Sequence, residues 1–122
     1  MPAALPHDQV EAYQRDGFVS PIAALSILEA KHFLAEYEQL EASLGGRPKA
    51  VEISLTHLSF EWAYDLAMHS RVLDAVEGVL GPDILVWATS IFPKQPHDPG
   101  YVSFHQGGTY WGLDSTAVVT AW

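Results

Sequence analysis

The sequence predicts an α+β fold in which N-terminal helices pack against a β-sandwich, and two features of the chain support this prediction. Helical segments are expected between residues 8 and 80, and in the longest of them, 27–44, apolar residues recur with a period near 3.6, which is typical of a helix that buries one face. From residue 84 onward, apolar and β-branched runs are separated by turn-forming residues, which is typical of buried strands. Helices followed by strands indicate an α+β architecture, and a double-sheet jelly roll is one form that would complete the sandwich.

The helical part has clear local signals. The expected helices cover residues 8–16, 27–44, 60–69 and 70–80. Ser26 and Glu29 have the spacing of a capping box, so Ser26 is expected to be the N-cap of the second helix. Gly45 and Gly46 end that helix, and Ser70 is expected to cap the fourth.

The second half of the chain is expected to be mostly extended. A short strand is expected at 51–53, and longer strands are expected at 84–92, 101–105 and 118–122. The proline-rich segment 93–100 predicts a loop, and Gly107-Gly108 predicts a turn.

Size and composition bound the function. The 122 residues suffice for one modest domain, and 48% hydrophobic with 17% charged residues indicates a globular protein. The net charge of −9 and the six scattered basic residues argue against nucleic acid or anionic membrane as a partner. No cysteine, signal peptide or membrane-spanning run is present in the sequence, which leads us to expect a cytoplasmic protein.

The last residues of the sequence are apolar and strand-like. Residues 117–122 read Ala-Val-Val-Thr-Ala-Trp, whereas domains usually end in polar, exposed residues. We therefore expect residues 1–122 to be the N-terminal portion of one longer domain. A helical layer would cover about 1–82 and the first core strands about 83–122.

One short motif carries chemistry. Non-haem Fe(II) oxygenases hold iron with two histidines and one carboxylate, and the first histidine and the carboxylate commonly form a His-x-Asp/Glu motif. His105 is the histidine of such a motif here, but Gly107 stands two residues later, where the carboxylate is expected. The next acidic residue, Asp114, lies too far along the chain to replace it by a simple shift of register.

In the order of its motifs, nearly the whole chain resembles the phytanoyl-CoA dioxygenase (PhyH) family of Fe(II)/2-oxoglutarate-dependent oxygenases. The most specific match is His-Gln-Gly-Gly-Thr-Tyr-Trp at residues 105–111. The remaining matches lie at residues 13–19, 65–76, 80–84, 92–94, 101–104 and 118–122.

The resemblance implies a double-stranded β-helix behind a helical layer, with Fe(II) and 2-oxoglutarate as cofactors. It implies that His105 is the first iron ligand and that the second histidine and the 2-oxoglutarate-binding arginine lie beyond Trp122. The expected activity is that of a dioxygenase acting on a small organic molecule, including one linked to coenzyme A or a carrier. A chain that ends at Trp122 is expected to be inactive alone, because an Fe(II) site needs three ligands. The sequence does not indicate an oligomeric state.

Three interpretations of Gly107 remain open. Some enzymes of this class have glycine or alanine at the carboxylate position and bind chloride to iron there, which makes the protein a halogenase. Alternatively, the site is degenerate and the protein is a non-catalytic binding protein. The third interpretation is an ordinary oxygenase with a sequence error, an engineered change or a substitute ligand.

The other candidate residues flank the motif. Large or polar side chains there could line a substrate or co-substrate pocket, namely Lys94, Gln106, Thr109, Tyr110 and Trp111. The remaining histidines lack ligand spacing and are interpreted as loop or surface residues.

Overall fold

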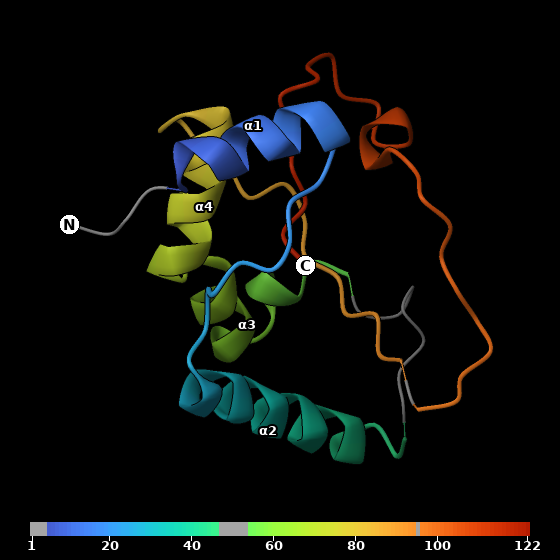
Figure 1. The fold of residues 1–122 in the computed structure, drawn as a ribbon. Coiled ribbons are helices and arrows are strands. Elements are labelled where there is room, and N and C mark those ends of the chain that lie inside the picture. The colour runs from blue at the N-terminus through green and yellow to red at the C-terminus, as the bar shows by residue number, and fades with distance from the viewer. Residues whose placement is uncertain (1–4, 47–53, 95) are drawn as a thin grey trace.

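The computed structural model describes residues 5–46, 54–94 and 96–122, and their regular structure is helical (Figure 1). The helices follow the predicted boundaries to within a few residues. They are α1 (His7–Asp16), α2 (Ile27–Ser43), α3 (Glu61–Ala67) and α4 (Ser70–Leu80), with short 3-10 turns η2 (Thr56–Leu58) and η3 (Gly107–Thr109). In Figure 1, α1 lies across one end of α4, α3 follows below, and α2 forms the opposite edge of the molecule.

Local signals place the helix ends where the sequence indicates. Ser26 caps α2, and both halves of the capping box with Glu29 are formed. Gly17 ends α1 in the left-handed conformation (φ 80°), which glycine adopts without strain. One detail differs: His69 is the N-cap of α4, and Ser70 is its first helical residue.

The predicted β-sandwich is wrong. The described parts of 84–92, 101–105 and 118–122 form no strand, and the only pairing among described residues is one antiparallel bridge between Ser54 and Ser90. The short strand expected at 51–53 lies outside the described residues. An apolar run becomes a strand only if a neighbouring segment supplies partners for its main-chain N–H and C=O groups. Here the N–H groups of residues 85–88 and 119–122 have no such partner among described residues.

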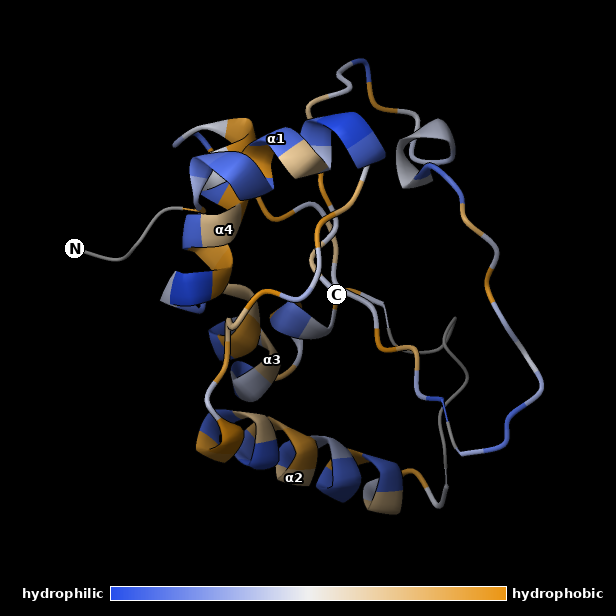
Figure 2. Ribbon diagram, viewed as in Figure 1, coloured by the Kyte–Doolittle hydropathy of each residue, from blue (hydrophilic) through white to orange (hydrophobic). Residues whose placement is uncertain are grey.

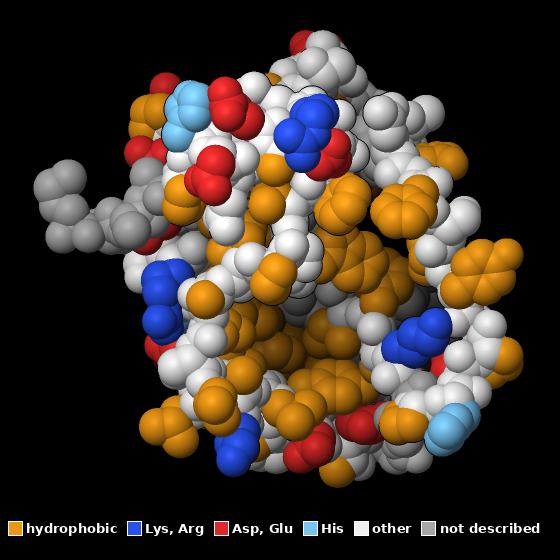
Figure 3. Space-filling model, viewed as in Figure 1, with side chains coloured by type: hydrophobic (Ala, Val, Ile, Leu, Met, Phe, Trp, Pro, Cys, Tyr) orange, Lys and Arg blue, Asp and Glu red, His pale blue; other side chains and the backbone are white. Residues whose placement is uncertain are grey.

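The protein buries little apolar surface. Its accessible surface is 9444 Å², whereas a compact monomer of this mass exposes about 6,500 Å². Among described residues only Leu5, Thr56 and Ala63 are buried, while Leu85 is 93% and Phe104 97% exposed. Figure 3 shows the consequence: apolar side chains gather around a hollow in the middle of this face of the molecule.

Apolar residues are exposed on helices and coil alike. Figure 2 shows hydrophobic colour along α2 and along parts of the coil that follows α4. Ring contacts link distant parts of the chain: the ring centroids of Phe92 and Trp122 lie 5.9 Å apart, and Phe104 lies 6.2 Å from Phe18, which precedes α2. Most of this aromatic surface still faces solvent. No helix within the described ranges is long and apolar enough to cross a lipid bilayer.

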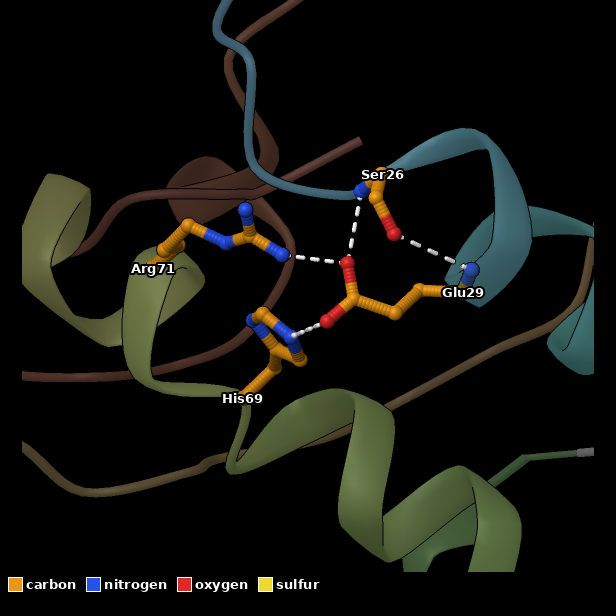
Figure 4. Close-up of polar contacts among 4 residues, drawn as sticks. All are labelled: Ser26, Glu29, His69 and Arg71. Atoms are coloured by element: carbon orange, nitrogen blue, oxygen red, sulfur yellow. Dashed lines mark hydrogen bonds and ion pairs between the residues drawn. The ribbon is translucent and has the colours of Figure 1, made fainter.

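A single carboxylate ties α2 to α4 (Figure 4). One oxygen of Glu29 accepts a hydrogen bond from the Ser26 main-chain N–H at 2.6 Å. The same oxygen forms an ion pair with Arg71. Its other oxygen lies 3.3 Å from Nε2 of His69. Glu29 thus completes its own helix cap and also contacts the start of α4.

A second polar tie holds the coil after α4 against η2. The Thr89 hydroxyl lies 2.7 Å from the Thr56 hydroxyl and 2.8 Å from Nδ1 of His57, and it accepts from the His57 N–H at 3.1 Å. The Leu55 N–H donates to the Thr89 carbonyl at 2.7 Å. These bonds satisfy the buried hydroxyl of Thr56 and fix one point of the 84–92 segment.

The exposed segment 84–92 predicts self-association. Unpaired main-chain groups flanked by apolar side chains form a template for pairing with another chain. We expect association that increases with protein concentration, and that increases with salt because screening reduces repulsion between chains of net charge −9. Sedimentation velocity of wild type, Leu85→Lys and the control Leu28→Lys on α2 measures this. Equal loss of association in both variants would contradict a role specific to 84–92.

Gly78 is expected to be required for docking of Leu5 on α4. A Cβ atom on Gly78 would lie 2.8 Å from Cβ of Leu5, far inside normal contact. Gly78→Ala should therefore lower the free energy of unfolding by about 1 kcal/mol or more, although alanine alone favours a helix by about 0.5–1 kcal/mol. Chemical denaturation checks this. Leu5→Gly should relieve the effect of Gly78→Ala, whereas Leu5→Ala, which keeps the Cβ, should not.

Protonation of Glu29 is expected to lower the stability of the protein in acid. Hydrogen bonds from Ser26 and then from His69, together with the positive charge of Arg71, lower the pKa of Glu29 from its usual 4.5 to about 2. Its stabilisation is therefore complete above pH 4.5 and is lost as the pH falls toward 2. Thermal melts followed by circular dichroism should show a steeper fall between pH 5 and 2.5 for wild type than for Glu29→Gln. Glu38→Gln, on an exposed part of α2, is the control and should behave as wild type.

Candidate functional site

His105 stands in an exposed coil immediately before η3. Its Nδ1 lies 2.9 Å from the carbonyl oxygen of Ser103. A carbonyl oxygen can only accept, so Nδ1 must carry the proton, and in the neutral ring Nε2 keeps its lone pair. Metal-ligating histidines use this arrangement, in which the second ring nitrogen donates to a carbonyl and fixes the tautomer.

The turn after His105 brings the aromatic residues back onto the motif. The Tyr110 N–H donates to the Gly107 carbonyl at 2.9 Å, which closes η3. The Tyr110 ring then meets the His105 ring edge-on, with 6.5 Å between centroids and 64° between planes. The Trp111 indole, half-buried, lies against Gly107. His105, Gly107, Tyr110 and Trp111 thus form one local cluster, which we call the His105 turn.

The other predicted pocket residues are not part of this cluster. Lys94 donates to the Gly100 carbonyl and closes the proline-rich loop, where Asp98 also accepts from the Gly100 N–H at 2.8 Å. Gln106 and Thr109 lie in the turn with exposed side chains. Within the described residues no contact joins Lys94 to the His105 turn, so the structure does not form a pocket from the five predicted residues.

The described residues around His105 do not form a complete metal site. Among them, no group of three or more His, Asp or Glu side chains is arranged to hold a metal ion. Two hollows in the described surface lie between α2 and α3 and between α1 and α4, and His105 lines neither. A three-ligand Fe(II) site therefore does not fit these residues alone.

Sequence reasoning missed the partners of two histidines. The sequence shows no ligand-spaced partner for His69 or His57, yet they contact Glu29 and Thr89 in the structure. The Ser26-x-x-Glu29 spacing was visible in the sequence, but nothing in it indicated that Glu29 would also contact a histidine forty residues away. Comparison with protein-family models, curated proteins and solved structures gives no match.

Proposed function

We propose that the protein acts as a non-haem Fe(II)/2-oxoglutarate-dependent oxidoreductase of the PhyH type on a small organic molecule, with His105 as one iron ligand. The observation that carries the proposal is the bond between Nδ1 of His105 and the Ser103 carbonyl, because this exposed histidine then keeps the lone pair of Nε2 for a metal. The sequence His-Gln-Gly-Gly-Thr-Tyr-Trp around it supports the choice of enzyme class.

The remaining ligands would come from polypeptide outside the described residues. A facial Fe(II) site needs three protein or exogenous donors, and the His105 turn offers one imidazole. When bound, iron and 2-oxoglutarate would supply the oxidising chemistry. What the chain itself does is to hold the imidazole in one tautomer and place aromatic rings beside it. Whether chloride also binds depends on the space beside Gly107.

A non-catalytic binding protein is the second candidate. The observation that favours it is the lack of a three-ligand group among the described residues. Loss of the carboxylate at position 107 would then mark a site that no longer binds iron, while the apolar hollow in Figure 3 remains a surface for contacts.

Turnover of the intact protein separates these candidates. With Fe(II) and 2-oxoglutarate, an oxygenase should form succinate, and His105→Ala should reduce the rate by more than about 100-fold, because even outer-shell changes cost 10–100-fold. His97→Ala, in the exposed proline-rich loop, is the matched control and should leave the rate unchanged.

Chloride decides the reaction class in the same assay. Succinate formation that requires chloride supports halogenation, and Gly107→Asp should then abolish chloride binding. Turnover without chloride supports hydroxylation. An intact protein that forms no succinate under either condition leaves the binding protein as the better proposal.

A further inference from the structure

Position 107 lacks a side chain for one of two physical reasons. Either the space beside it is open, as a halide site requires, or a neighbouring group occupies it. The backbone does not decide the matter, because Gly107 starts a 3-10 turn and does not have the positive φ that favours glycine. The atoms around the Cα of Gly107 therefore decide whether this space is open or occupied.

The space beside Gly107 is filled by Trp111. A Cβ atom on Gly107 would lie 3.0 Å from Cζ2, 3.2 Å from Cη2 and 3.5 Å from Cε2 of the indole. Carbon atoms in favourable contact are about 3.5–4.0 Å apart, so a side chain at position 107 would press against the ring unless the indole moved by a few tenths of an ångström. The contrast with Gly108 is direct: a Cβ there would meet nothing within 4 Å.

We infer that Gly107 is a packing glycine for the Trp111 indole, and that no halide binds in the place of a position-107 carboxylate. Within the proposed function, this favours oxygenation over halogenation. The inference itself rests on the contact between Gly107 and Trp111, so its test needs neither iron nor turnover.

Paired alanine substitutions test the contact. Gly107→Ala and Gly108→Ala remove the same backbone freedom from the same turn, but only the first adds an atom against the indole. The probe is the Trp111 indole N–H resonance in the NMR spectrum, assigned by its loss in Trp111→Phe. We expect Gly107→Ala to shift this resonance and Gly108→Ala to leave it in place. The other three tryptophans show whether the variant keeps its fold.

A double-mutant cycle and a halide titration complete the test. In Trp111→Ala, adding Gly107→Ala should cost no stability beyond that of Gly108→Ala, because the clash is gone. Sodium bromide added to the wild type should give no saturable shift of the Gly107 amide resonance. An unmoved Trp111 resonance in Gly107→Ala would overturn the inference. So would a saturable bromide shift that Gly107→Ala removes. Absence of succinate formation would overturn the proposed function but would leave this packing result standing.

Discussion

One carboxylate joins the start of α2 to the start of α4, while α2 also contacts α3. Glu29 closes the capping box with Ser26 and contacts both His69 and Arg71 at the start of α4 (Figure 4). In most small domains such a tie adds little to a large apolar core. Here only three described residues are buried, so a polar contact of this kind is set against a much smaller core. The same carboxylate therefore serves local helix formation and long-range packing together.

The burial deficit explains why order is concentrated in the helical half. A helix satisfies its own main-chain groups within a single segment, whereas an extended segment needs a neighbour. Residues 84–92 obtain one neighbour, through the contacts of Thr89 and Ser90 with the chain around η2, and the N–H groups of 85–88 stay unpaired among the described residues. Apolar side chains such as Leu85 then remain exposed, because no second layer is formed over them.

This difference also sets how far the sequence could predict the structure. The helices and the Ser26–Glu29 cap depend on residues three or four positions apart, so local sequence patterns were enough to predict them. The prediction of strands was wrong because an apolar run such as 84–92 indicates burial but does not indicate which segment would pair with it. The partners of His69 and His57 were missed for the same reason, since both contacts span more than thirty residues.

The contacts of the His105 turn join residues that are close in the sequence. The turn therefore supports a functional argument although the predicted sandwich is wrong. The bond from His105 to Ser103, the edge contact with Tyr110 and the contact of Trp111 with Gly107 all lie within residues 103–111. None needs a sheet, so none is lost when the predicted strands are absent. The sequence could show that Gly107 lacks a carboxylate, but only coordinates show that an indole four residues later takes the space. That contact changes the meaning of the glycine from an empty ligand position to a filled one.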